Sequence, residues 1–389
     1  MPGDAIVFTI FLVFTGAAVA ATLALFARQS LLVAYVLLGV VLGPSVFGLV
    51  SDPQVIRELA HIGIMFLLFL LGLNLNPREL AQMVRRTTTV TVISSLVFAT
   101  VGILVALAFG YASYDAFVIG AAMIFSSTIL GIKLLPTSVL HHQRTGEVMI
   151  SILLLQDVIA IVFILVLQGI GQENLLVRDI GLTLLKLPLL LAVAFVLDRF
   201  LLLPLLRRFD RIQEYIFLLA IGWCLGIAEL SHWLGLSAEI GAFIAGVALA
   251  ASPIALFISE SLKPLRDFFL ILFFFSLGAG FDISVLPGVL VPAAILAAAA
   301  LTGKPLVFRW LLRRAGESGK RAREIGIRLG QLSEFSLLMA VVAASAGACS
   351  SKASSLIQLA TLISFLGSSY WIVMRVPNPI AVRDELRLD

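Results

Sequence analysis

The feature that most constrains this chain is a succession of long apolar runs separated by short charged breaks. A helix needs about 20 mostly apolar residues to cross a lipid bilayer, and we count about thirteen runs near that length. The runs cover approximately residues 5–26, 31–50, 59–74, 89–110, 113–135, 147–170, 180–203, 215–233, 238–252, 264–281, 286–311, 325–347 and 355–374. The sequence therefore predicts an all-α polytopic membrane protein with about thirteen transmembrane helices.

Composition excludes the soluble classes. Hydrophobic residues make up 60% of the 389 residues and charged residues 13%, whereas soluble domains have about 45–50% and about 25%. The net charge of +4 predicts no nucleic-acid partner, because the basic residues lie in short loops between apolar runs, in contact with a lipid bilayer. Cys224 and Cys349 lie far apart in apolar surroundings, so we expect neither a disulfide framework nor a metal site, and no cofactor.

The distribution of basic residues predicts the orientation. One alternate set of loops holds little more than Arg57, Arg178 and Lys352. The other set holds Arg28, Arg78, Arg85, Arg86, Lys133, Arg144, Arg207, Arg208, Arg211, Lys263, Arg266, Arg313, Arg314, Lys320, Arg321, Arg323, Arg375, Arg383 and Arg387. Because loops rich in Lys and Arg stay in the cytoplasm, we expect the N-terminus outside and the C-terminus cytoplasmic in the inner (plasma) membrane.

Asp157 is the clearest charge inside an apolar run. It follows Gln156 in the segment Ser151–Leu167, which contains no other charge. A charged side chain at the centre of a membrane helix costs about 2.5–3.5 kcal/mol, so it needs a reason. An ionised carboxylate binds a cation and a protonated one releases it, which couples cation movement to proton movement. The alternative is a structural carboxylate paired to a buried base.

Lys304 and Glu334 are two further charges within apolar runs. Each either forms a structural ion pair or compensates charge at a transport site. Glu239 opens a short helix, where the helix dipole favours an acidic residue, and we interpret it as structural. His61 lies at the end of a run with no acidic or cysteine partner expected nearby, so we assign it no metal.

Two segments have the composition of interrupted helices. Phe125–Pro136 contains three successive hydroxyl residues and Gly131, and Gly326–Ser336 carries two glycines and Gln331. The three hydroxyl residues are Ser126, Ser127 and Thr128. Hydroxyl groups can replace lost backbone hydrogen bonds beside a cavity, and paired broken helices indicate the midplane site of a transporter. The alternative is ordinary small-residue packing, since Gly39–Gly43, Gly222–Gly226 and Gly326–Gly330 are GxxxG pairs.

Seven motifs carry a family resemblance. They are GVVLGPSVFG at 39–48, FLLGLNL at 69–75, SSTILGIKLL at 126–135, LQD at 155–157, GLSAEIGAFIAG at 235–246, Lys304, and GQLSEFS at 330–336. In this order over about residues 5–375, the chain resembles the membrane part of cation:proton antiporters of the second monovalent family. That family includes Kef-type potassium efflux systems, plant plastid exchangers and some bacterial sodium/proton antiporters.

The resemblance implies roles for individual residues. Asp157 is the expected ion- and proton-binding carboxylate. The other expected ion-site residues are Gln156, Ser126, Ser127 and Thr128, with Lys304 and Glu334 compensating charge and Gly330 and Gln331 on the second crossed helix. It also implies a fold of inverted repeats with two crossed, unwound helices.

The resemblance further implies a domain division and a homodimer. The expected division is panel (dimer) helices at 1–80 and 206–285, core transport helices at 81–175 and 286–375, a linker helix at 176–205, and a cytoplasmic tail at 376–389. Kef-type relatives usually continue into a cytoplasmic nucleotide-binding domain. Either that regulatory domain or subunit lies outside this chain, or the chain is a shorter relative. Asn74 also departs from the Glu that many Kef-type members carry there.

These features predict a secondary active antiporter that exchanges K⁺, or alternatively Na⁺, for H⁺ by alternating access. The Gln156–Asp157 pair resembles the potassium pattern, and one carboxylate that exchanges one proton for one cation predicts electroneutral exchange. The alternative is a gated potassium efflux channel on the same fold, which would need rings of acids or carbonyls along a pore. A carrier of organic anions would need more midplane basic residues than Lys304. We expect no enzyme, since no nucleophile–base–orienter set is present.

Overall fold

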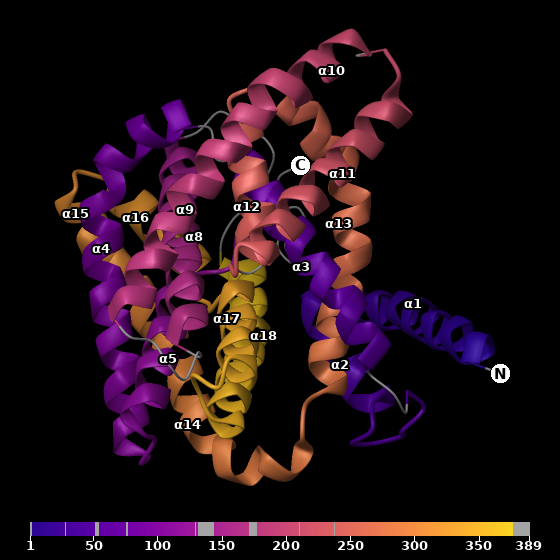
Figure 1. Cartoon of the computed structure of the whole chain (residues 1–389). Helices are drawn as coiled ribbons and strands as arrows, with labels where there is room; N and C mark the ends of the chain where they lie inside the picture. Colours follow the sequence, from indigo (N-terminus) through magenta and orange to yellow (C-terminus); the bar gives the residue numbers. More distant parts are fainter. Residues whose placement is uncertain are drawn as a thin grey trace. The chain divides into compact units, whose positions relative to one another are not determined.

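The structure is a computed structural model of the chain. It describes residues 2–27, 29–50, 54–74, 77–128, 130, 144–170, 177–209, 211–236 and 238–375. These residues form helices and no strands (Figure 1), and seven of the helices are long and apolar enough to cross a membrane. Five shorter apolar helices accompany them. The all-α membrane fold is confirmed, whereas the total of thirteen spans stays a prediction.

The chain divides into two compact units. The first unit comprises Met1–Ala18, Tyr35–Ala81 and Glu173–Gly280, and the second comprises Val19–Ala34, Gln82–Gln172 and Phe281–Asp389. Helices within the first unit are α3 (Gln54–Asn74), α9 (Val177–Leu197), η1 (Asp198–Leu202), α10 (Leu203–Arg208), α11 (Gln213–Trp233), α12 (Ala238–Leu249) and α13 (Ile254–Ala279). Helices α1 (Pro2–Phe26), α2 (Leu31–Leu42) and α4 (Pro77–Ala108) cross a unit boundary.

The second unit contains the remaining helices. They are α5 (Ser113–Ile124), α8 (Arg144–Ile170), η2 (Ile283–Val285), α14 (Leu286–Ala298), η3 (Ala299–Gly303), α15 (Lys304–Arg314), α16 (Gly319–Arg328), α17 (Glu334–Ser345) and α18 (Ser351–Arg375). Helices α17 and α18 run side by side, drawn in yellow in Figure 1, and α17 also packs on α5 and α8. The assignment of the units to a dimer panel and a transport core stays a prediction.

Small residues allow close helix packing in the first unit. A methyl group added at Gly39 of α2 would overlap the carbonyl oxygen of Phe275 in α13. Within the described residues, Gly222 and Gly226 of α11 face open space instead. The small-residue interpretation therefore fits the first GxxxG pair and not the one on α11.

Both predicted helix interruptions are present where the structure describes the chain. Helix α5 ends at Ile124, and Phe125 adopts an extended conformation (φ −81°, ψ 146°). Residues 329–333 are likewise non-helical between α16 and α17. The runs predicted at 113–135 and 325–347 are thus broken, because polar residues follow the helix ends and replace helical hydrogen bonds. Gly131 and Pro136 lie outside the described residues.

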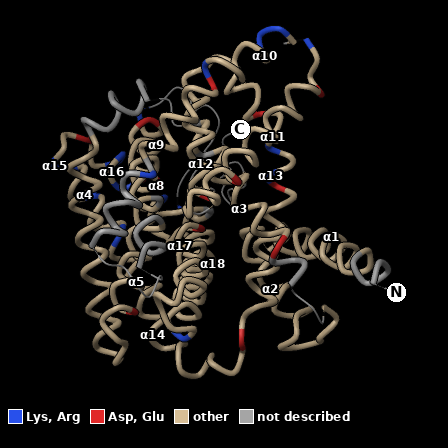
Figure 2. The backbone as a smooth tube through the Cα atoms, viewed as in Figure 1, with Lys and Arg blue, Asp and Glu red and all other residues tan. Residues whose placement is uncertain are grey.

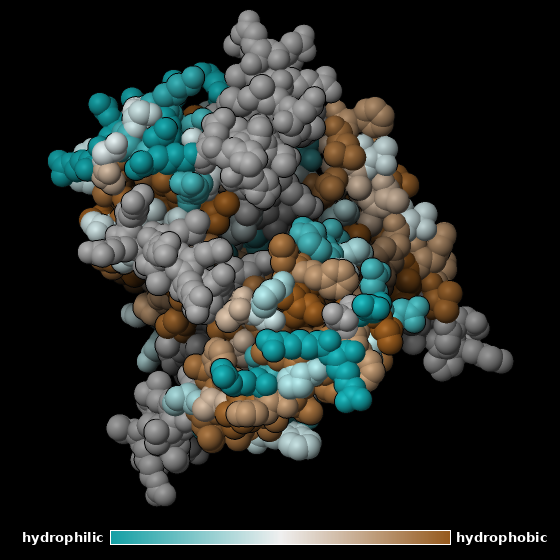
Figure 3. All heavy atoms as spheres, turned by 90° about the horizontal axis from the view of Figure 1, so that it is seen from above, coloured by the Kyte–Doolittle hydropathy of each residue, from teal (hydrophilic) through white to brown (hydrophobic). Residues whose placement is uncertain are grey.

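The described surface exposes many large apolar side chains, which in water would be a liability. Examples are Phe11, Leu23, Leu96, Phe200 and Leu306, each more than half exposed. On the face shown in Figure 3, brown apolar residues alternate with groups of teal hydrophilic ones. Charged residues are sparse along the helices and gather at places such as the end of α10 (Figure 2). This distribution is that of helices in contact with lipid.

Candidate ion-binding site

The two helix breaks contact each other inside the second unit. The Ser126 hydroxyl in the first break donates a hydrogen bond to the carbonyl oxygen of Leu329 in the second at 2.9 Å. The Ser336 hydroxyl in the first turn of α17 donates to the carbonyl oxygen of Ala122 in α5 at 2.7 Å. Each break frees backbone groups that are costly to bury unpaired, and the opposite break supplies partners for them.

Asp157 lies on α8 beside the first break and is 1% exposed. The Thr128 hydroxyl lies 3.4 Å from its Oδ2 and donates to it. Glu334, the first residue of α17, is also buried, and its charge is near enough to act on Asp157. The N-terminal end of α17 favours a negative charge at Glu334. The site therefore contains two carboxyl groups that interact electrostatically.

The side-chain amide of Gln156 holds both sides of the first break. Its Oε1 accepts a hydrogen bond from the Ser126 N–H at 3.0 Å, and its Nε2 donates to the Ile124 carbonyl at 3.1 Å. The first break is further closed by Ser127, whose hydroxyl accepts from the Leu130 N–H at 3.0 Å. Gln156 thus connects the backbone of the break to the helix that carries Asp157.

Lys304 is fully buried where α15 follows the π-helical turn η3. Its Nζ donates to the carbonyl oxygens of Phe125 at 2.6 Å and Gln331 at 3.1 Å, one from each break. Nζ also lies 5.3 Å from the centre of the Phe98 ring. Within the described residues its hydrogen bonds go to oxygens of the two breaks and not to Asp157. A positive charge is favourable there because the carbonyl end of α5 is negative.

The second break is ordered by serines and by close packing. Ser333 caps α17, since its hydroxyl accepts from the Phe335 N–H at 3.1 Å and its own N–H donates to the Ser336 hydroxyl. A methyl group added at Gly330 would lie 2.9 Å from Pro305 Cγ in α15. Glycine therefore permits the close approach of this break to the helix that carries Lys304.

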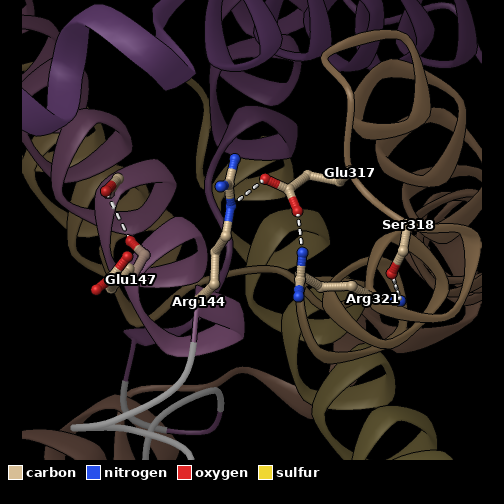
Figure 4. A network of polar contacts seen from close by, with 6 residues as sticks. Arg144, Glu147, Glu317, Ser318 and Arg321 are labelled. Atoms are coloured by element: carbon tan, nitrogen blue, oxygen red, sulfur yellow. Dashed lines mark hydrogen bonds and ion pairs between the residues drawn. The ribbon is translucent and has the colours of Figure 1, made fainter.

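A charged network lies at the start of α8 (Figure 4). The carboxylate of Glu317, between α15 and α16, accepts from Arg144 Nε at 2.9 Å and from Arg321 at 2.6 Å. Burial alone would raise the pKa of Glu317, but the hydrogen bonds and charges of Arg321 and Arg144 outweigh it and lower that pKa. The network ties α8, which carries Asp157, to α16, which leads into the second break.

The comparisons with known proteins agree with this geometry. A sequence model of the family described as sodium/hydrogen exchanger, transmembrane, matches residues 10–375. The chain belongs to this family. The chain is therefore a multi-pass membrane protein, as the resemblance to cation:proton antiporters predicts, and its relatives are transporters.

Three curated relatives illustrate the similarity. The iron transporter MagA of Paramagnetospirillum magneticum is 30% identical over 346 residues, which cover 89% of this chain and 80% of MagA. The K⁺ efflux antiporter 6 of Arabidopsis thaliana is 30% identical over 325 residues, which cover 80% of this chain and 54% of the relative. The glutathione-regulated potassium-efflux system protein KefC of Salmonella schwarzengrund is 28% identical over 345 residues, which cover 87% of this chain and 56% of KefC. The chain thus spans little more than half the length of the two potassium-efflux relatives.

A solved structure shares the fold. The sodium proton antiporter MjNhaP1 of Methanocaldococcus jannaschii aligns with a TM-score of 0.66 over 95% of both chains, at 16% sequence identity. At this identity the match supports the fold of the chain and not the ion that it binds.

The structure brings together nearly every site residue predicted from the sequence. Asp157, Gln156, Lys304, Glu334 and the two breaks all lie in the second unit. Sequence reasoning missed four residues. Two are Arg144 and Glu317, which join the start of α8 to the segment before α16. The other two are Ser364 and Ser368 of α18, which form hydrogen bonds with the second break. The only signal for the two serines was a polar face with a spacing of three or four residues along α18.

Glu239 and His61 form a close side-chain contact that the sequence did not predict. Within the first unit, His61 Nε2 on α3 lies 2.6 Å from Oε1 of the buried Glu239 on α12. The expectation that His61 has no acidic partner is wrong, because α3 and α12 pack together although they are far apart in sequence. Among the described residues, no three His, Cys, Asp or Glu side chains gather as metal ligands.

Proposed function

We propose that the protein is a secondary active antiporter that exchanges one monovalent cation, K⁺ in preference to Na⁺, for one H⁺ by alternating access. The observation that carries the proposal is Asp157, a buried carboxylate placed beside two broken helices that contact each other. Broken helices at mid-membrane expose backbone and hydroxyl oxygens, which are ligands for an alkali cation. The similarity to potassium-efflux proteins supports K⁺.

Competition at one site accounts for the coupling. When Asp157 is ionised, its carboxylate and the Thr128 hydroxyl offer oxygens to a cation that has shed part of its water. When Asp157 is protonated, that charge disappears and the cation leaves. Because the two states exclude each other, each conformational cycle carries a cation one way and a proton the other.

The charges of the site favour electroneutral exchange. Asp157, Glu334 and Lys304 are all buried in the second unit, and in their ionised forms they sum to one negative charge. The other buried charge beside the second break, Arg328, is paired with Glu324. Either one monovalent cation or one proton neutralises that sum. The cost of a net charge in the membrane therefore favours the two occupied states equally and disfavours the empty one.

We propose further that the second unit is the transport core and the first unit the panel of a homodimer. The protein would lie in the inner membrane with its N-terminus outside, as the loop charges indicate. A channel is the less favoured alternative, because the matching family is one of exchangers and the relatives include antiporters.

The test is reconstitution in liposomes that contain a pH dye, with an imposed proton gradient and added K⁺, Na⁺ or Fe²⁺. We expect K⁺ to dissipate the gradient more strongly than Na⁺, at a rate that clamping the membrane voltage leaves unchanged. Cation flux without proton movement would support the channel instead. Proton movement with Fe²⁺ alone would overturn the monovalent substrate, and voltage-dependent exchange would overturn the stoichiometry.

A further inference from the structure

One face of α18 is polar, although the helix lies inside the second unit. The polar residues are spaced by three or four positions, which places them on one side of a helix. They are Ser354, Gln358, Thr361, Ser364 and Ser368. Near its start this face contacts α17, where the Ser354 hydroxyl donates to the carbonyl oxygen of Ala340 at 3.2 Å. Buried hydroxyl groups need hydrogen-bond partners, so the partners of these residues show which part of the structure the polar face stabilises.

Two of these hydroxyl groups bind the second helix break. The Ser364 hydroxyl accepts a hydrogen bond from the Leu332 N–H at 3.1 Å and donates to the Thr361 carbonyl at 2.8 Å. The Ser368 hydroxyl donates to Oε1 of Gln331 at 2.9 Å. The three side chains Ser364, Ser368 and Gln331 are at most 2% exposed. Helix α18 thus holds the second break at two points, the backbone N–H of Leu332 and the side chain of Gln331.

The Ser368 bond sets the orientation of the Gln331 amide. With Oε1 turned to α18, the Nε2 group of Gln331 points toward the carbonyl oxygen of Ser127 in the first break, 3.5 Å away. The backbone carbonyl of Gln331 meanwhile accepts from Lys304 at 3.1 Å. Loss of the Ser368–Gln331 hydrogen bond would therefore change the surroundings of Lys304 and of both breaks.

A second contact ties α18 to the first broken helix. Asp115, in the first turn of α5, accepts from the Ser350 N–H at 2.8 Å and from the Ser350 hydroxyl at 2.7 Å. Ser350 immediately precedes α18. The helix is therefore anchored to α5 at its start and to the second break in its middle, although it carries no charged residue near Asp157.

We propose that Ser364 and Ser368 are positioning residues that set the cation affinity of the site and its preference between K⁺ and Na⁺. They act through Leu332 and Gln331 and do not touch the cation. The inference rests on the proposed antiport. A site whose ligands come from unwound backbone keeps its size only if the backbone is held, so loosening the second break weakens cation binding before it slows the conformational cycle.

The experiment compares Ser364→Ala and Ser368→Ala with Ser369→Ala in liposomes. Ser369 is a matched control, since it is the next residue on α18 and its buried hydroxyl has no hydrogen-bond partner among the described residues. Loss of one hydrogen bond should raise the cation concentration for half-maximal exchange about three- to tenfold, with the maximal rate within about twofold. The ratio of the K⁺ and Na⁺ values should change, whereas Ser369→Ala should match the wild type.

The outcomes separate the two proposals. Absence of cation-dependent proton movement in the wild-type protein would overturn the antiport itself. If the wild type exchanges but Ser364→Ala and Ser368→Ala both keep wild-type half-saturation and ion ratio, the positioning role is wrong. A fall in maximal rate and unfolding temperature with unchanged half-saturation would also overturn it, since that pattern marks a purely structural role. Because the two variants are read separately, failure of one to fold leaves the other as the test.

Discussion

The side-chain amide of Gln156 accepts a hydrogen bond from the backbone N–H of Ser126 at 3.0 Å, across the first helix break. The same amide donates to the carbonyl oxygen of Ile124 at 3.1 Å. Gln156 therefore uses both the donor and the acceptor of its amide, whereas an ionised carboxylate can only accept. The residue beside Asp157 fixes the backbone of the site, and its chemistry cannot be exchanged for a carboxylate without cost.

Gln156→Glu tests this requirement. The carboxylate would still accept from Ser126, but it could not donate to Ile124, and it would place another negative charge beside Asp157. We expect the free energy of unfolding in detergent to fall by about 1–3 kcal/mol, since a buried carbonyl loses its partner. Gln358→Glu on α18, outside the break, is the comparison. Equal stability of Gln156→Glu and the wild type would contradict the assignment.

Asp157→Asn should abolish cation-dependent proton movement in liposomes while the protein still folds. The amide can neither carry the exchanged proton nor offer a charge to the cation. Asp198→Asn is a suitable control, because Asp198 is a buried carboxyl group of the first unit and lies outside the proposed site. Exchange that persists in Asp157→Asn would show that another group carries the proton.

Lys304→Met should cost both stability and transport. The substitution keeps much of the side-chain volume but leaves the carbonyl oxygens of Phe125 and Gln331 without their buried donor. We expect a loss of about 2–4 kcal/mol in the free energy of unfolding, measured by thermal or denaturant unfolding in detergent. A variant with wild-type stability and wild-type exchange would remove Lys304 from the site.

The sequence predicts those features of the site that depend on residues within a single segment of the chain. Ser126, Ser127, Thr128 and Gln331 interrupt apolar runs, so the two breaks are visible in the sequence alone. The partners of the breaks are not, because the Lys304–Phe125 and Ser364–Leu332 bonds join separate helices. Nothing in the local pattern specifies which carbonyl a distant lysine or serine meets.

Helix boundaries show the same limit. The apolar run predicted at 264–281 begins earlier in the structure, since α13 starts at Ile254 and continues through Pro264. Proline is tolerated inside membrane helices, where neighbouring groups satisfy the freed carbonyl. The contact between His61 and Glu239 was missed for a related reason, because it depends on how α3 packs on α12.

The glycines of the first unit give a paired test of packing. Gly39→Ala should sharply reduce the yield of folded protein, because the added methyl group overlaps the backbone of Phe275 and backbone cannot move aside locally. Gly222→Ala makes the same chemical change on α11, where no atom of the described residues lies within 4 Å of the added carbon. We expect that variant to keep wild-type yield and unfolding temperature. Equal behaviour of the two variants in size-exclusion chromatography would contradict the packing described for α2 and α13.

Glu317 gives the pH prediction. Its pKa is lowered because the hydrogen bonds and charges of Arg321 and Arg144 outweigh the effect of burial. A group whose pKa is lower in the folded state stabilises that state above its unfolded pKa, about 4.3 for Glu, and the contribution is lost as the pH falls through the lower folded value. Glu317→Gln should therefore be less stable than the wild type at pH 7, by roughly 1 kcal/mol because solvent screens the partly exposed arginines.

The difference between the two proteins should shrink as the pH falls from 5 towards 3, where the wild-type carboxylate takes up its proton. Thermal unfolding in detergent across this range measures it. Glu147→Gln is the matched control, since Glu147 is an exposed acid near the start of α8, close to Arg144 (Figure 4). A gap between wild type and Glu317→Gln that stays constant from pH 7 to pH 3 would mean that Glu317 supports α8 and α16 by packing rather than by its charge.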